Sequence, residues 1–157
     1  MPIRLVSPAR KTPIMISKEE ITLASINCVQ HAATSDAAPC VLLVEDDKAL
    51  RRYLEVVLDR AGYKVASAAD GLEAMKILLN TPIDIVITDA VMPNLNGAQL
   101  CRFIRSNEAL ASLPIVLLSA LDRKNTGPET EQANAFLSKP VSPEVLLQTL
   151  TNVNRKS

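Results

Sequence analysis

Residues 83–97 read IDIVITDAVMPNLNG, and this stretch decides the fold. Its first six residues are mostly apolar and β-branched, which is typical of a short strand that is buried on both faces. The strand ends at Asp89, a loop follows, and Gly97 leads into a predicted helix with apolar Leu100, Phe103 and Ile104. A buried strand that is connected through a loop to an amphipathic helix is the repeating unit of an α/β fold.

The same unit recurs between residues 40 and 154. We predict further strands at residues 40–44, 64–68, 114–118 and 135–138, and helices at residues 50–61, 71–80 and 142–154. Ser142 is expected to cap the last helix, whose inward side chains are predicted to be Val145, Leu146, Leu150 and Val153. Strands that alternate with helices predict right-handed crossovers and a parallel sheet with helices on both faces.

The segment between Ser119 and Phe136 departs from this regularity. Residues 121–128 have almost no apolar periodicity, and Gly127-Pro128 interrupts the pattern further. We therefore expect only a short helix here, at about residues 129–134.

Residues 1–39 form an N-terminal extension that precedes a domain at residues 40–157. Ser17 and Glu20 have the spacing of a capping box, so one helix could run to about residue 33, and residues 34–39 are typical of a linker. Two interpretations stay open: a disordered extension with a marginal helix, or a helix docked on the domain or on a partner.

Composition narrows the function classes. The 157 residues are 48% apolar with zero formal net charge, so no basic field favours direct contact with nucleic acid. No apolar run approaches the roughly 18 residues of a membrane span, and the N-terminus lacks a signal-peptide pattern. Cys28, Cys40 and Cys101 show neither metal-site spacing nor a disulfide framework, which favours a reducing cytoplasm.

Polar residues stand where the predicted strands end. Glu45 and Asp46 follow the first strand, Asp89 the third, Ser119 the fourth and Lys139 the fifth. In an open parallel sheet, ligands bind outside the carboxyl ends of the strands. We therefore expect these side chains to meet in one pocket.

That combination has a definite chemistry. Carboxylates that share a pocket repel one another and need a counter-charge, which a hard cation such as Mg²⁺ supplies through oxygen ligands. One carboxylate can then act as a nucleophile on phosphorus and become an aspartyl-phosphate. The Lys139 ammonium and the cation would stabilise the charge on the phosphoryl group, and the Ser119 hydroxyl can donate to a phosphoryl oxygen.

These residues resemble the signature of a known family. The matching elements, in order, are VEDD at residues 44–47, Leu50-Arg51, DAVMPNLNG at residues 89–97, LSA at residues 118–120 and Lys139-Pro140. Together they resemble the receiver domain of response regulators in two-component signal transduction, a CheY-like domain, over residues 40 to about 154. The resemblance implies a flavodoxin-like sheet of five parallel strands in the order 2-1-3-4-5.

The resemblance also implies a role for each matching residue. It implies that Asp89 is the phosphoacceptor, assisted by Lys139 and Ser119, and that Ser119 and Phe136 are the switch residues. Mg²⁺ would be bound by Glu45, Asp46, Asp89 and the backbone carbonyl of Val91. The Lys139-Pro140 peptide is expected to be cis. Apolar Val91 and Leu121 would flank the phosphoryl group and prolong its lifetime.

The implied function is that of a signalling module and not of an enzyme. Asp89 would take a phosphoryl group from a histidine kinase or a phosphotransfer protein, and a protein-interaction surface would change in response, with residues 121–134 becoming ordered. The implied setting is cytoplasmic, with a downstream protein partner and neither nucleic acid nor membrane bound directly; a homodimer is left open.

Other interpretations compete with this one. A receiver fold could serve as an interaction module that no longer uses phosphate. A phosphohydrolase of similar fold would need a second aspartate two residues after the nucleophile, where this chain has Val91. Glu45-Asp46-Asp47 alone could merely cap a helix, and Asp47 itself is better interpreted as a cap than as a ligand. Cys101 is expected to be a packing residue.

Overall fold

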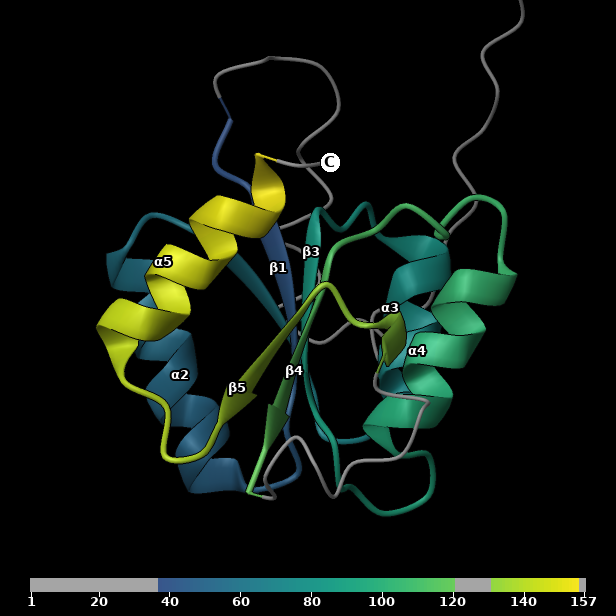
Figure 1. Cartoon of the computed structure of the whole chain (residues 1–157), viewed down its shortest axis with the longest axis horizontal. Coiled ribbons are helices and arrows are strands. Elements are labelled where there is room, and N and C mark those ends of the chain that lie inside the picture. Colours follow the sequence, from purple (N-terminus) through teal and green to yellow (C-terminus); the bar gives the residue numbers. More distant parts are fainter. Residues whose placement is uncertain (1–36, 121–130, 156–157) are drawn as a thin grey trace, which may run out of the picture.

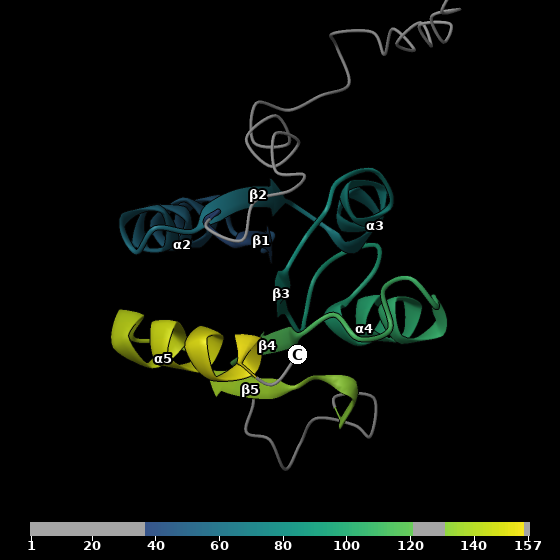
Figure 2. The same cartoon turned by 90° about the horizontal axis from the view of Figure 1, so that it is seen from above.

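The computed structural model describes residues 37–120 and 131–155. It contains a five-stranded sheet in the order β2-β1-β3-β4-β5, in which every pairing is parallel. Seen from above, the strands follow one another in this order (Figure 2). The strands are β1 (Cys40–Val44), β2 (Lys64–Ala68), β3 (Ile85–Asp89), β4 (Ile115–Ser119) and β5 (Ala135–Ser138). The predicted flavodoxin-like topology is confirmed.

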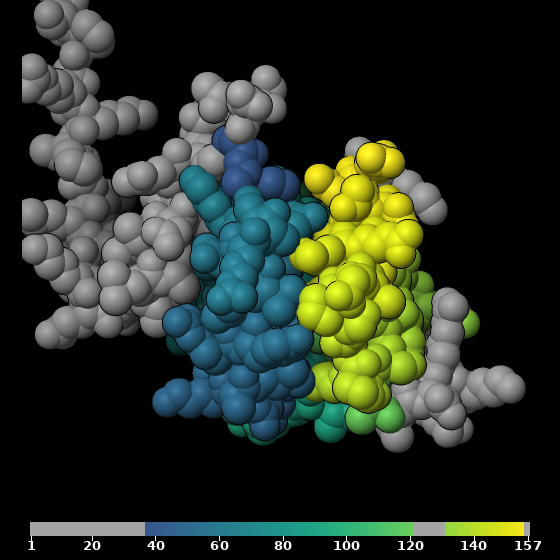
Figure 3. Space-filling view, turned by 90° about the vertical axis from the view of Figure 1, so that its left-hand side faces the viewer, coloured from purple at the N-terminus to yellow at the C-terminus, as the bar shows by residue number. Residues whose placement is uncertain are grey.

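Helices cover both faces of the sheet, as the alternating pattern predicts. They are α2 (Lys48–Arg60), α3 (Gly71–Asn80), α4 (Gly97–Ser106) and α5 (Pro143–Asn154). Helices α2 and α5 lie on one face and α3 and α4 on the other (Figure 1). In the space-filling view, α2 and α5 lie side by side (Figure 3). Among the described residues, no helix is long and apolar enough to cross a membrane.

The sheet is the centre of two apolar clusters. All residues of β1, β3 and β4 are buried. Because successive side chains of a strand point to opposite faces of the sheet, they enter the two clusters alternately. Leu43 and Leu118 pack with α2 and α5, whereas Leu42 and Leu117 pack with α3 and α4. Burial on both faces fixes the strand ends, and with them the side chains that follow each strand.

Side-chain caps set where helices begin. The Asp47 carboxylate accepts a hydrogen bond from the Leu50 N–H at 2.7 Å, which confirms Asp47 as a cap of α2. Ser142 caps α5 by accepting from the Val145 N–H at 3.3 Å. Asn96 forms a capping box with Gln99 at the start of α4. These caps fix the helix starts next to the strand ends that carry the predicted site.

Gly97 is required by a close approach of backbone to backbone. A Cβ atom added at residue 97 would lie 2.2 Å from the carbonyl oxygen of Asp89 and 3.0 Å from the Cα atom of Ala90. Any other residue would push α4 away from the end of β3. The start of α4 is therefore packed directly against the predicted phosphoacceptor strand.

Several predicted boundaries are corrected. β3 begins at Ile85 and not at residue 83, because the Asp84 carboxylate accepts the Cys40 N–H at 2.7 Å and ends the regular ladder there. β4 begins after Pro114, which has no N–H to donate. Val145 is 48% exposed and does not point inward, although Leu146, Leu150 and Val153 are buried as predicted.

Some of the predicted features fall on residues outside 37–120 and 131–155. The helix expected within residues 17–33 and the position of Leu121 lie outside the described residues, as do residues 129 and 130 of the helix expected at residues 129–134. The described part of that expected helix, residues 131–134, is not α-helical, so this prediction is wrong there. Residues 131 and 132 form a turn of 3₁₀ type. Cys101 is free and buried, as predicted, but Cys40 is disulfide-bonded, so the expectation of unpaired cysteines is wrong there.

Candidate functional site

Three carboxylates meet at the carboxyl end of the sheet. Glu45 and Asp46 follow β1, Asp89 ends β3, and the pairing of Val44 with Thr88 brings these two strand ends side by side. Each of the three offers a carboxylate oxygen within 4.8 Å of the others. Glu45 and Asp89 are buried while Asp46 is exposed. The predicted convergence of residues 44 positions apart is confirmed.

Lys139 joins two of these carboxylates. Its Nζ atom lies 2.7 Å from Glu45 Oε2 and 2.8 Å from Asp89 Oδ2, and it donates a hydrogen bond to each. The Lys139 backbone N–H donates to the Ser119 carbonyl at 2.7 Å, which ties the end of β5 to the end of β4. The Lys139-Pro140 peptide is cis, as predicted. The ammonium group thus supplies part of the counter-charge that the pocket needs.

Burial and charge act in opposite directions on these groups. Burial raises the pKa of Glu45, and the Asp89 charge raises it further, so the hydrogen bond from Lys139 offsets this rise only in part. Burial lowers the pKa of Lys139, but its hydrogen bonds to Asp89 and Glu45 outweigh burial and leave the pKa raised. Lys139 therefore stays protonated, and the Glu45 carboxyl ionises less readily than an ordinary glutamate.

Asp89 is held firmly, and only about a tenth of its side chain is exposed. Its Oδ1 atom accepts the Val91 N–H at 3.1 Å, while Oδ2 accepts Lys139. The Ala90 N–H donates to the Leu118 carbonyl at 2.7 Å, which fixes the chain just after the aspartate. Val91 is 65% exposed beside it. A carboxylate oriented in this way can act as a nucleophile towards a group that approaches from solvent.

The donor set suits a hard divalent cation. All the side-chain donors are carboxylate oxygens, the type that Mg²⁺ prefers, and they outnumber the one ammonium in contact with them. The hydrogen bond from the Val91 N–H places the backbone of residue 91 beside the Asp89 carboxylate. Asp47 is not part of this set, since its side chain caps α2.

Ser119 and Phe136 occupy two different layers of this end of the sheet. Ser119 ends β4 and is fully buried. Phe136 lies on β5 opposite Leu117, and it is partly buried against the apolar cluster under α3 and α4. Ser119 thus lies at the end of the sheet that carries the carboxylates. The Phe136 side chain instead lies on the face of β5 that packs towards α3 and α4.

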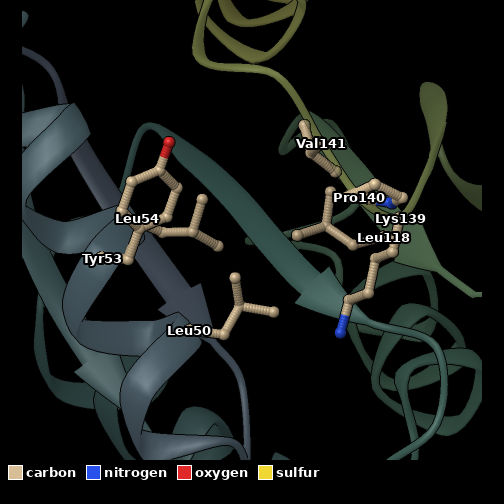
Figure 4. A pocket seen from close by; sticks show the side chains of 7 residues that line it. All are labelled: Leu50, Tyr53, Leu54, Leu118, Lys139, Pro140 and Val141. Atoms are coloured by element: carbon tan, nitrogen blue, oxygen red, sulfur yellow. The ribbon is translucent and has the colours of Figure 1, made fainter.

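An apolar cavity adjoins the site. It has a volume of about 520 Å³ and is lined by residues of α2, by Leu118 and by the connection between β5 and α5, namely Leu50, Tyr53, Leu54, Leu118, Lys139, Pro140 and Val141. Leu50 and Tyr53 face Pro140 and Val141 across it (Figure 4). The carboxylates do not line this cavity, so Lys139 is the residue that it shares with the acidic site.

Arg51 contacts the site from helix α2, although sequence patterns alone gave it no role. This residue donates from Nη1 to the Glu45 carbonyl oxygen at 2.6 Å. A signal was present in the sequence, because a cation in the first turn of a helix opposes the helix dipole and calls for a compensating contact.

The family model of the response regulator receiver domain matches residues 41–151. The chain belongs to this family. This receiver domain is 36% identical over 110 residues to the protein PilG of Pseudomonas aeruginosa, with 68% of this chain and 81% of PilG covered. It is 34% identical over 124 residues to the transcriptional regulatory protein GltR of the same species, with 74% of this chain and 49% of GltR covered. The chain thus spans about half the length of GltR.

Solved receiver structures give the same result. The chemotaxis response regulator CheY4 of Vibrio cholerae has a TM-score of 0.71 and 32% identity, with 74% of this chain and 99% of CheY4 covered. The response regulator TrrA of Thermotoga maritima, solved in complex with Mg²⁺–BeF, has a TM-score of 0.68 and 25% identity, with 73% of this chain and 98% of TrrA covered. The receiver fold and the family assignment therefore rest on sequence and structure alike.

Proposed function

We propose that this receiver domain accepts a phosphoryl group on Asp89 from a histidine kinase or a phosphotransfer protein, and thereby switches a protein-interaction surface. The observation that carries the proposal is the position of the Asp89 carboxylate, which lies beside two further carboxylates and within 2.8 Å of the Lys139 ammonium. This arrangement combines an oriented nucleophile with a cation-binding set and a fixed positive charge.

The transfer would proceed by attack of an Asp89 oxygen on phosphorus. A new O–P bond forms while the N–P bond of a phosphohistidine breaks, and the imidazole nitrogen keeps the electron pair and takes up a proton. Lys139 stabilises the negative charge on the phosphoryl oxygens, and the Ser119 hydroxyl donates to one of them in the product. The chain acts as a phosphoryl acceptor in a signalling step and not as an enzyme with a separate substrate.

We assign the cation site to Glu45, Asp46, Asp89 and the Val91 carbonyl. Mg²⁺ would add positive charge beside the phosphoryl oxygens, which is the chemistry that carboxylate-bound Mg²⁺ supplies in phosphoryl transfer. Support comes from the three convergent carboxylates and from the backbone of residue 91 next to Asp89. The buried, unfavourable charge of Glu45 would be offset by such a cation.

The output would begin at Ser119 and Phe136. Movement of the Ser119 hydroxyl towards the phosphoryl group would open space that Phe136, half-buried on β5, could enter. The surface that changes would include β5 and residues 121–134, and a downstream protein would bind it; a homodimer is compatible with this surface. We propose a cytoplasmic setting, where kinases draw on ATP. We also propose that residues 1–39 are an extension that precedes a receiver unit at residues 40–157.

Labelling with a small phosphodonor tests the acceptor. Acetyl phosphate with Mg²⁺ should add one phosphoryl group to the full chain, as measured by intact mass, and Asp89→Asn should abolish the addition. Asp47→Asn is the matched control, because it removes a neighbouring charge but keeps a side chain that can cap α2. Undiminished labelling of Asp89→Asn would refute the assignment, and an unlabelled wild type would favour a phosphorylation-independent interaction module.

A further inference from the structure

We propose that Arg51 is a positioning residue for the acidic pair. Its guanidinium group holds the backbone of Glu45 and Asp46, so that their carboxylates face the cation site in a fixed orientation. The inference rests on the proposed function, since it assigns a role in the binding of a divalent cation at Glu45, Asp46 and Asp89.

The geometry follows from the position of Arg51 in the first turn of α2. Side chains on a helix point back towards its N-terminus, so a long side chain at residue 51 covers the loop that precedes the helix. Arg51 Nη1 lies 2.6 Å from the Glu45 carbonyl oxygen and 3.5 Å from that of Asp46. The shorter contact is a strong hydrogen bond from a charged donor, and the longer one is weak.

Glu45 is thereby held on three sides. Its N–H donates to the Ala68 carbonyl of β2 at 3.1 Å, and its carbonyl accepts from Arg51 of α2. Its carboxylate accepts from Lys139 through one oxygen and from the Asp47 N–H, at 3.2 Å, through the other. Arg51 is the side chain that fixes the carbonyl side of this residue.

Arg51 orients the acidic pair without neutralising it. Among the described residues, its hydrogen bonds go to the carbonyl oxygens of Glu45 and Asp46, whereas Lys139 pairs with carboxylates. A carbonyl contact leaves the carboxylate oxygens available to a metal ion. It also explains a cation at the positive end of a helix dipole, where the charge is otherwise unfavourable.

Charge and position predict opposite effects of removing Arg51. If Arg51 acted only as a nearby positive charge, its neutralisation would strengthen the binding of Mg²⁺, because less repulsion would oppose the cation. If Arg51 positions the ligands, its removal must weaken the binding of Mg²⁺ instead. The sign of the change therefore separates the two roles.

The experiment is a Mg²⁺ titration of the full chain, followed through the backbone amide NMR shifts of residues 45–47 and 89–91. For Arg51→Gln we expect affinity to fall about tenfold or more, since residues that orient metal ligands typically contribute about 10- to 100-fold. Arg51→Lys should fall between this variant and the wild type, because an ammonium keeps the charge but not the guanidinium fork. Arg52→Gln is the matched control, with the same change of charge one residue away on an exposed side chain that pairs with Glu55.

A second measurement without metal distinguishes this inference from the proposed function. In EDTA, the Asp47 amide proton should exchange faster in Arg51→Gln than in Arg52→Gln, since the carbonyl anchor of Glu45 is lost. Unchanged or tighter Mg²⁺ binding by Arg51→Gln would overturn the positioning role. If wild-type protein bound no Mg²⁺, the cation part of the proposed function would fall, and equal Asp47 exchange in the two variants would then overturn the anchoring role as well.

Discussion

Glu45 is a residue at which stability and chemistry conflict. Its carboxylate is buried beside Asp89, and burial raises its pKa above the ordinary 4.5 despite the hydrogen bond from Lys139. A carboxyl group with a raised pKa binds its proton more tightly in the folded state than in the unfolded chain. Without metal, the free energy of unfolding must therefore fall as the pH rises through the range in which the Glu45 carboxyl group loses its proton.

Replacing Glu45 by Gln should remove that pH dependence. Gln has no proton to lose, so Glu45→Gln in EDTA should gain stability relative to wild type as the pH rises from about 4 to about 7. Urea denaturation across this range measures the difference in unfolding free energy. Exposed Glu108→Gln is the control. Parallel curves for wild type and Glu45→Gln would contradict the prediction.

Val91 should govern how long the phosphoryl group persists. Hydrolysis needs a water molecule in line with the phosphorus, and an exposed apolar side chain beside Asp89 offers that water no hydrogen bond. We expect Val91→Asn to speed the loss of phosphate about tenfold, which corresponds to about 1.4 kcal/mol of barrier. Intact-mass decay after removal of the phosphodonor measures this rate. Val145→Asn alters an exposed valine on α5 and should leave the rate unchanged; equal rates in both variants would contradict a role for Val91.

The position of helix α4 requires that its first residue, Gly97, has no side chain. Gly97→Ala would force a methyl group against the Asp89 carbonyl, so it should destabilise the protein by about 1–3 kcal/mol and also slow phosphorylation. Gly62→Ala is the comparison, because residue 62 has a φ of +88° but a Cβ atom added there would meet no other atom within 4 Å. It should destabilise by about 1–2 kcal/mol through the backbone alone and leave phosphorylation unchanged. Equal labelling rates in the two variants would refute the steric coupling.

Element boundaries were predictable where the local sequence decides them. Caps and stops such as Asp47, Gly62 and Ser142 carry their own signals, and the helices start or end there. The start of β3 was not predictable, because it depends on a hydrogen bond from the Cys40 N–H to Asp84, which is distant in sequence. The exposure of Leu72 and Leu79 on α3 also depends on how the helix is rotated against the sheet, which periodicity alone does not fix.

The molecule as a whole brings the site together on a sheet that is buried on both faces. Cations that bind only the folded state stabilise it, and a hundredfold excess over the dissociation constant contributes about 2.7 kcal/mol. We expect Mg²⁺ to raise the melting temperature of wild type and of Asp47→Asn, but much less that of Asp46→Asn. Thermal unfolding at increasing Mg²⁺ measures this. An equal rise in all three proteins would contradict the assignment of Asp46 as a ligand.

The candidate site was predictable in membership but not in its contacts. The residues that follow strands, such as Glu45, Asp89 and Lys139, follow from the rule that the carboxyl ends of parallel strands meet at one edge. The sequence does not tell that the Lys139 ammonium bridges two carboxylates, because this depends on the separation of strands β1, β3 and β5. Arg51 was missed for the same reason, since its partner is a backbone carbonyl, which every residue has.

The close contact of Gly97 with the Asp89 carbonyl limits how a lineage of such chains can diverge. Asp89 can be exchanged for Asn with almost no change of volume, so descendants could lose the proposed phosphoacceptor in a single step and still fold. Every substitution at residue 97 adds at least a Cβ atom, which would lie only 2.2 Å from the Asp89 carbonyl oxygen. Among descendants that have given up the chemistry, we therefore expect the glycine to outlast the aspartate.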